Sequence, residues 1–214
     1  MGPKKLWPDP DSDTFVLERC LRQKGYASVG GLDEVGRGPL AGPVVAACVV
    51  LQADCDHSLF VDSKLINAQN RSLLYGELQN NGALIGVGIV SEKDIDRLNI
   101  LQASLLAMKK AVLAMPLQPD FLLVDGNQPI PVTIPQQTLV KGESKSASIA
   151  AASIVAKVVR DELMDRYHLQ HPVYNFHKNR GYPTREHRQA IQEYGPCSIH
   201  RRSFKCVKEY VPEE

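Results

Sequence analysis

The chain has 214 residues, of which 43% are hydrophobic and 23% charged, which is typical of one globular α/β domain with a small appendage. The formal net charge of +1 excludes a protein that is basic overall, so any nucleic-acid-binding surface must be local. The five cysteines are scattered and form no CxxC pair, which favours reduced thiols over a disulfide framework. No apolar segment follows the N-terminal lysines, so we expect no secretory signal and a cytoplasmic location.

The first elements of the chain are a predicted helix at residues 11–24 and two predicted strands within residues 30–51, joined by a glycine-rich turn. The apolar run at residues 44–51 is too short to span a membrane, and its β-branched residues are typical of a buried strand. Asp33 and Glu34 come at the end of the first strand. Burying unpaired carboxylates is very costly, so we favour a cation bound beside them over two acids that simply face water.

The middle of the chain is predicted to continue the α/β pattern. The expected elements are a helix at residues 67–79, a strand at 83–90, a helix at 99–115, and short strands at 121–124 and 138–141. Gly86 and Gly88 lie on one face of their strand, where we expect a helix to pack closely. Ser91 is expected to cap a short turn. The helix after it is apolar on most sides and is therefore expected to be buried.

The last part of the chain contains a long helix and then a change in composition. Residues 144–167 are predicted to form a helix whose alanines could lie close to a sheet, and we take good helix propensity as the main reason for these alanines. Between residues 171 and 208 there are eight lysines and arginines but only two acids, interleaved with histidines and aromatic residues. This pattern favours a phosphate-binding surface over an ordinary solvated face. Thr184 is the predicted N-cap of a helix that ends at Gly195.

Acidic residues recur at the ends of the predicted elements. Asp125 ends the strand at residues 121–124, and Glu143 comes just before the alanine-rich helix. Functional groups of an α/β sheet gather at such strand ends, where Asp33 and Glu34 also lie. Four carboxylates brought together would repel one another unless cations neutralised them, and carboxylate oxygens suit Mg²⁺ or Mn²⁺. Two such ions could hold a phosphodiester, activate a water molecule and stabilise the leaving oxygen.

Several segments, in this order, resemble ribonuclease HII, the type 2 ribonuclease H. They are GLDEVGRGPLAGPVVAACVVL, VDSK, DRLNILQASLLAMKKAV, LLVDGN, VKGESKSASIAAASIVAKVVRDELM and GYPTREH…GPCSIHRRSF. The resemblance covers nearly the whole chain, from about residue 14 to residue 204. The resemblance implies an α/β protein with a ribonuclease H-like fold, a mixed central sheet flanked by helices and a small C-terminal helical segment. On this basis residues 1–168 form the catalytic domain, and residues 169–214 form a basic helical segment that completes the substrate groove.

The resemblance also implies an activity. The family cleaves the RNA strand of RNA/DNA hybrids and nicks duplex DNA 5′ to an embedded ribonucleotide, leaving 3′-hydroxyl and 5′-phosphate ends. It uses two divalent ions, Mn²⁺ or Mg²⁺, with the substrate. The family's catalytic, metal-binding acids correspond to Asp33, Glu34, Asp125 and Glu143, of which Asp33 is the best candidate to bridge both ions. Its substrate-binding residues correspond to Gly36, Arg37, Gly38, Lys64 and Tyr182.

The chain departs from the family pattern in two places. The family more usually has Asp where this chain has Glu143, so the carboxylate is one methylene longer here. The family commonly has the sequence DSKKL, whereas Leu65 follows Lys64 directly in this chain. The first departure concerns metal geometry and metal preference, and the second concerns a phosphate-binding role for Lys64.

The glycine-rich turn and Tyr182 suit the recognition of a ribose. A protein can distinguish RNA from DNA at one position only through the 2′-hydroxyl, which both donates and accepts hydrogen bonds. Backbone groups exposed by Gly36 and Gly38 could supply such contacts. Tyr182 could form a hydrogen bond through its phenol and stack its ring on the sugar or on the next base pair. The alternative is that Tyr182 is an ordinary half-buried aromatic with its hydroxyl in water.

Two functions of other classes remain as alternatives. One is a metal-free ribonuclease that uses histidines of the C-terminal segment as general acid and base, which would leave a 2′,3′-cyclic phosphate and ignore chelators. The other is a module that binds RNA/DNA hybrids without cleaving them. The related ribonuclease HIII carries an extra N-terminal substrate-binding domain, for which the motif begins too early here. We expect a monomer that binds RNA/DNA hybrids and ribonucleotide-containing DNA and does not bind membranes.

Overall fold

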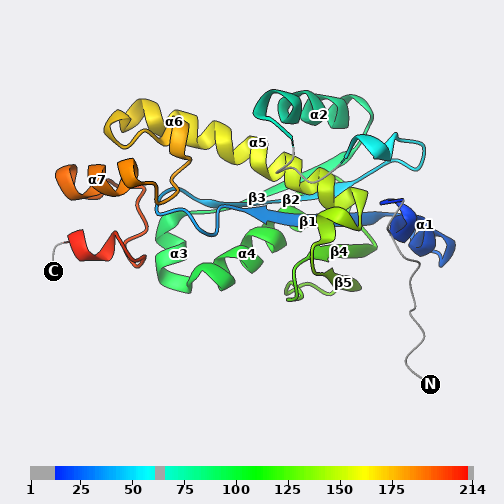
Figure 1. Ribbon diagram of the computed structural model, residues 1–214. Helices are drawn as coiled ribbons and strands as arrows, with labels where there is room; N and C mark the ends of the chain where they lie inside the picture. The colour runs from blue at the N-terminus through cyan, green and yellow to red at the C-terminus, as the bar shows by residue number, and fades with distance from the viewer. Residues whose placement is uncertain (1–12, 61–65, 212–214) are drawn as a thin grey trace, which may run out of the picture.

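The computed structural model describes residues 13–60 and 66–211 of the chain. Its centre is a mixed five-stranded sheet with the strand order β3-β2-β1-β4-β5 (Figure 1). The strands are β1 (Val29–Val35), β2 (Val44–Val50), β3 (Leu84–Val90), β4 (Phe121–Asp125) and β5 (Gln136–Leu139). β2 runs antiparallel to both β1 and β3, whereas β4 runs parallel to both β1 and β5. The predicted α/β fold with a mixed central sheet is confirmed.

Helices cover both faces of this sheet. They are α1 (Val16–Gln23), α2 (Ala68–Asn80), α3 (Glu92–Leu98), α4 (Ile100–Leu113), α5 (Ala147–Gln170), α6 (Phe176–Asn179) and α7 (Arg185–Tyr194). α5 and α2 lie on one face, and α3 and α4 lie on the other (Figure 1). No helix in the two described ranges is long and apolar enough to cross a membrane. The five cysteines are free thiols, as the sequence predicts.

Small residues allow the helices to approach the sheet closely. A Cβ atom on Gly88 would lie only 2.0 Å from the carbonyl oxygen of Ala107 in α4, so the predicted close approach of a helix to β3 is confirmed. On the opposite face, a Cβ atom on Gly31 of β1 would lie 2.1 Å from the backbone of Ser148 in α5. The alanines of α5 are buried in the same layer, so close packing, and not helix propensity alone, explains them.

Some predicted boundaries and environments differ from the structure. The turn that Ser91 was expected to cap is the helix α3, and the side chain of Ser91 accepts its N-terminal hydrogen bond from Asp94. α4 is buried on one face only, because it forms an outer layer that packs on the sheet. Leu113, on the opposite face of α4, is 63% exposed. β5 begins at Gln136, earlier than predicted.

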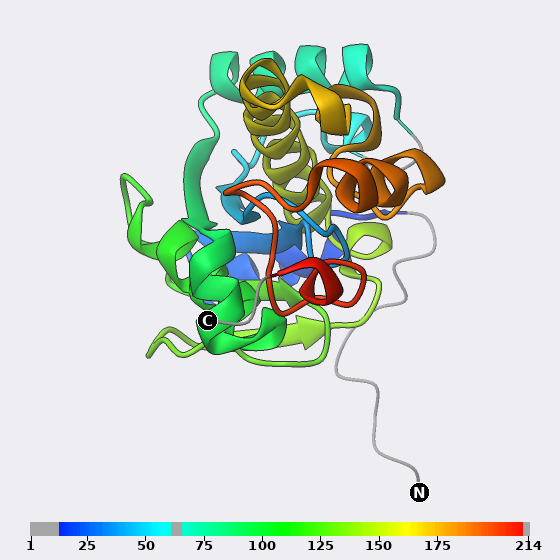
Figure 2. The same cartoon turned by 90° about the vertical axis from the view of Figure 1, so that its left-hand side faces the viewer.

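The C-terminal helices lie beyond the ends of β1 and β4. Figure 2, which views the molecule from that side, shows α7 and the last described residues, up to residue 211, in front of the sheet. Tyr174 and Phe176 pack into a core together with Leu40 and Met164, so the expectation that the aromatic residues of this segment form a surface is wrong for these two. The predicted N-cap at Thr184 is confirmed, since its hydroxyl accepts a hydrogen bond from the amide of His187. α5 continues through the predicted boundary at residues 168 and 169.

Candidate active site

The four acids predicted from the sequence meet at one end of the sheet. Asp33 and Asp125 follow the paired residues Leu32 and Val124 on the neighbouring parallel strands β1 and β4. Glu34 comes next along β1. The loop after β5 brings in Glu143, because the neighbouring amide of Gly142 donates a 2.7 Å hydrogen bond to the Oδ1 atom of Asp125. The adjacent ends of two parallel strands, and one hydrogen bond from a backbone amide to a carboxylate, therefore bring together acids that are up to 110 residues apart in the sequence.

These acids border one cavity of about 190 Å³. Its lining residues are Asp33, Glu34, Val35, Arg71, Asp125, Glu143, Ser153, Lys157 and Tyr182. The cavity thus combines all four predicted acids with the predicted ribose-contacting tyrosine. A larger groove of about 460 Å³ lies along α7 and contains no residue of the predicted site.

The carboxylates of this cavity perturb one another. Burial and the negative charges of Glu34, Asp125 and Glu143 raise the pKa of the Asp33 carboxyl well above its ordinary value. Burial raises the pKa of Glu34 to about 7, although the guanidinium of Arg37 opposes this shift from 3.2 Å away. The hydroxyl of Ser153 donates a 2.9 Å hydrogen bond to Oε2 of Glu143. Asp33 and Glu34 therefore bind protons more readily than isolated carboxyl groups do, and a cation bound among the acids would relieve the same repulsion.

The glycine-rich turn lies next to this cavity. Gly36 has a φ of +98°, a conformation that favours glycine, and its missing side chain leaves room for the guanidinium of Arg160. A Cβ atom on Gly38 would lie 3.7 Å from Cε1 of Tyr182, so the turn and the tyrosine ring are neighbours. Tyr182 is 43% exposed, which leaves its ring accessible from outside. Four of the predicted substrate-binding residues thus lie together. The fifth, Lys64, lies outside the described residues.

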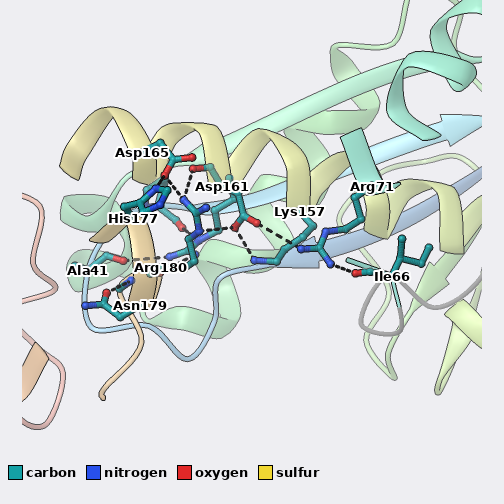
Figure 3. A network of polar contacts seen from close by, with 12 residues as sticks. Ala41, Ile66, Arg71, Lys157, Asp161, Asp165, His177, Asn179 and Arg180 are labelled. Carbon is teal, nitrogen blue, oxygen red and sulfur yellow. Dashed lines mark hydrogen bonds and ion pairs between the residues drawn. The ribbon is translucent and has the colours of Figure 1, made fainter. Parts of the chain in front are cut away.

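The cavity also contains basic residues that sequence reasoning missed. Lys157 of α5 and Arg71 of α2 both line it, and both approach the carboxylate of Asp161 (Figure 3). The Nζ atom of Lys157 donates a 2.5 Å hydrogen bond to Asp161, and a guanidinium nitrogen of Arg71 lies 3.8 Å from it. The spacing of Ser153 and Lys157, four residues apart, was the available signal, because such residues share a helix face.

Two of the C-terminal histidines, His187 and His200, are core residues and are not arranged as catalytic groups. His187 and His200 are buried, and their Nε2 atoms lie 3.1 Å apart. Nδ1 of His187 donates to the carbonyl of Tyr182, while Nδ1 of His200 accepts from the amide of Cys197. These partners require both rings to be neutral, and burial lowers the pKa of His200 to about 3. Both rings therefore have a structural role in the core. This argues against a metal-free ribonuclease that would use them as general acid and base.

The donor set of the cavity fits hard divalent cations, since carboxylate oxygens are the ligands that Mg²⁺ and Mn²⁺ prefer. Within residues 13–60 and 66–211, no group of three or more His, Cys, Asp or Glu side chains is arranged so that it could hold a metal ion without moving. The raised pKa of Asp33 supplies the physical argument for the fit, because a cation placed among these acids would relieve their mutual repulsion.

The same architecture occurs in solved structures. The ribonuclease H2 of Pyrococcus horikoshii OT3 superposes with a TM-score of 0.72 at 23% identity, covering 86% of this chain and 96% of that one. A structure of Bst-RNase HIII in complex with Mn²⁺ superposes with a TM-score of 0.65 at 20% identity, covering 94% of this chain and 73% of that one. The protein therefore belongs to the class of proteins with a ribonuclease H-like fold, and it carries a cluster of acids at the strand ends of that fold.

Sequence comparison narrows this class to one family. The family model described as Ribonuclease HII matches residues 30–207. The chain is 58% identical to the Ribonuclease HII of Desulfotalea psychrophila over 202 residues, which are 93% of this chain and 90% of that protein. The chain belongs to the ribonuclease HII family.

Proposed function

We propose that this ribonuclease cleaves the RNA strand of RNA/DNA hybrids and nicks duplex DNA 5′ to an embedded ribonucleotide, leaving 3′-hydroxyl and 5′-phosphate ends. The observation that supports this function is the shared cavity of four acids and Tyr182, with Gly38 beside the tyrosine ring. Acids alone would suit many phosphodiesterases. Their position next to a site that could contact a 2′-hydroxyl favours a substrate that contains ribonucleotides.

The acids Asp33, Glu34, Asp125 and Glu143 would hold two divalent ions, Mn²⁺ or Mg²⁺, with the substrate. When bound, such ions supply an activated water and neutralise charge on the phosphate and the leaving oxygen. Two of these carboxylates are already held in place by hydrogen bonds within the protein. The amide of Gly142 orients Asp125, and Arg37 holds Glu34.

The remaining groups of the cavity would position the substrate. Lys157 and Arg71 present cationic side chains to the space beside the acids, where they would contact phosphate oxygens. Gly36, Arg37 and Gly38 would contact the ribose through the backbone, and Tyr182 would stack against the sugar. The basic segment of residues 169–214 would complete the groove for the duplex by contacts to the phosphate backbone.

The test uses a DNA duplex with one embedded ribonucleotide, incubated with the full chain in Mg²⁺, in Mn²⁺ and in chelator. We expect a single cut 5′ to the ribonucleotide in either metal, with a 3′-hydroxyl end and no cleavage in chelator. A 2′,3′-cyclic phosphate made in chelator would identify the metal-free ribonuclease instead. Binding without cleavage in any metal would identify the non-catalytic module.

A further inference from the structure

Two arginines, Arg160 and Arg201, are buried beneath the glycine-rich turn. Both are 0% exposed and are among the largest fully buried side chains of the described residues. Neither forms an ion pair with a carboxylate within residues 13–60 and 66–211. Burial lowers the pKa of Arg160 to about 10 and that of Arg201 to about 9, so both remain charged at neutral pH. A buried charge needs compensating hydrogen bonds, and the backbone of the turn supplies them.

Arg201 holds the turn itself. Its Nη2 atom donates to the carbonyl of Gly36 at 2.6 Å, and its Nη1 atom donates to the carbonyl of Arg37 at 3.0 Å. Its Nε and Nη2 atoms donate to the carbonyl of Gly42 at 2.9 Å and 2.8 Å. The planar guanidinium therefore fixes three carbonyls of one short loop from a single point, which a lysine ammonium on its flexible stem cannot reproduce.

Arg160 connects this loop to the segment that carries Tyr182. Its guanidinium donates to the carbonyls of Pro43 and Ala41, at 3.0 Å and 3.2 Å, and to the carbonyl of Arg180 at 3.0 Å. Arg180 lies two residues before Tyr182. A direct backbone hydrogen bond joins the same two segments, because the amide of Leu40 donates to the carbonyl of Gly181 at 2.7 Å.

The inward carbonyls determine where the amides of the turn point. In a trans peptide the C=O and N–H groups point in opposite directions, and the described residues contain no cis peptide bond. Because the carbonyls of Gly36 and Arg37 point at Arg201, the amides of Arg37 and Gly38 point away from it. In the part of the chain that the structure describes, these two amides donate to no acceptor. The turn therefore has two amides directed away from Arg201 and without a protein acceptor, and one of them belongs to Gly38, which lies beside the ring of Tyr182.

We propose that Arg201 and Arg160 are positioning residues for ribose recognition. Arg201 directs the amides of Arg37 and Gly38 toward the 2′-hydroxyl oxygen, and Arg160 sets the distance between that turn and Tyr182. This inference rests on the function proposed above. In this proposal the two buried arginines touch no substrate. They contribute to the discrimination between ribose and deoxyribose by holding the groups that contact the sugar.

The experiment measures kcat/KM on a duplex with one ribonucleotide and the inhibition constant of the same duplex made entirely of DNA. The first step is the wild type, since failure to cut the ribonucleotide duplex would overturn the proposed function rather than this inference. In Arg201→Lys we expect kcat/KM to fall by roughly ten- to a hundredfold, the scale of a displacement of about 1 Å in recognition groups. The inhibition constant of the all-DNA duplex should not change.

A rescue and a stability control separate positioning from folding. Adding guanidinium at non-denaturing concentration to Arg201→Ala should restore part of the lost kcat/KM, because the ion fills the vacated space and donates to the same carbonyls. Leu21→Ala, in a buried position of α1 far from the turn, serves as a control that lowers the melting temperature without changing discrimination. The inference would be overturned if Arg201→Lys weakened binding of the all-DNA duplex by the same factor as it lowered kcat/KM on the ribonucleotide duplex. It would also be overturned if both quantities kept their wild-type values in Arg201→Lys.

The role of Arg160 is tested by a double-mutant cycle. If Arg160 acts by placing Tyr182, then Tyr182→Ala should cost less in an Arg160→Lys background than in the wild type, because coupled residues are not additive. Additive losses would remove Arg160 from the recognition of the ribose.

Discussion

The acidic cavity and the glycine-rich turn handle buried charge in opposite ways. In the cavity, burial and three neighbouring carboxylates raise the pKa of Asp33, so the surrounding protein disfavours the charged form of this acid. Beneath the turn, Arg160 and Arg201 are equally buried, but six hydrogen-bonded carbonyls of the loop and its neighbour satisfy them. A cation bound among the acids would favour their charged forms, whereas the backbone of the protein already satisfies the two arginines beneath the turn.

The largest effect is expected from removing an acid of the cavity. Asp33→Asn or Asp125→Asn should lower kcat by roughly a thousandfold or more, the scale of losing a principal electrostatic stabiliser of the transition state. Duplex binding should be largely retained, because the basic surface is unchanged. Single-turnover cleavage and fluorescence anisotropy would measure the two quantities. Asp54→Asn, in an exposed loop, is the matched control and should cleave normally. Near-normal cleavage by either cavity variant would remove these acids from the catalytic site.

Divalent ions should stabilise the protein through the same acids. At a concentration a hundred times the dissociation constant, a bound ion adds about 2.7 kcal/mol to the free energy of unfolding. Differential scanning calorimetry in Mn²⁺ or Mg²⁺ should therefore show a melting temperature several degrees higher than in NaCl of equal ionic strength. The increase should be smaller in Asp33→Asn. An equal increase in that variant would place the bound ions elsewhere.

The histidine pair behind Tyr182 should make the protein sensitive to acid. His200 has a folded-state pKa of about 3, below its unfolded value, so the unfolded state binds more protons at mildly acidic pH. The neutral pair contributes fully to the free energy of unfolding above about pH 6.5. This contribution is lost as the pH falls toward 3, by at most about 1.4 kcal/mol per pH unit. His187, Cys197 and the ring of Tyr174 face His200 and offer it no negative partner.

Urea unfolding between pH 7 and pH 4 would measure this slope. His200→Gln, which cannot become charged, should show a flatter dependence than the wild type. Equal slopes for the two proteins would contradict the assignment of neutral, buried rings.

The smallest effect is expected from shortening Glu143. Glu143→Asp restores the residue that the family pattern more usually has, and a carboxylate remains within reach of the cavity. We expect kcat to change by less than about tenfold, the equivalent of 1.4 kcal/mol, with a change in the ratio of Mn²⁺- to Mg²⁺-supported rates. Steady-state kinetics in each metal would measure both quantities. An inactive variant would show that the cavity depends on the longer side chain.

Much of the sheet could be predicted from the sequence because its signals are local. The apolar run of β2 and the short apolar strand β4 carry their own length and β-branched composition. Gly86 and Gly88 identified the face on which a helix packs. The exposed side of α4 could not be predicted, because exposure depends on which other elements cover a helix, and apolar composition does not report that.

The acids of the cavity could be predicted for a related reason. Each one ends or precedes a recognisable element, and the ends of parallel strands meet at one edge of a sheet. Arg160 and Arg201 could not be predicted in their observed environment. An arginine in a sequence is expected at the surface, and backbone carbonyls more than a hundred residues away leave no mark on its neighbours.

α5 carries residues of both regions on one face. Ser153 and Lys157 border the acidic cavity, and Arg160 follows one turn later beneath the glycine-rich loop. Seven residues of helix span about 10 Å at 1.5 Å per residue, a distance that hydrogen bonding along the helix keeps nearly constant. On the proposed function, α5 fixes the distance between the recognised sugar and the cleaved phosphodiester bond. The rise of this helix would then determine the position of the cleaved bond relative to the ribonucleotide.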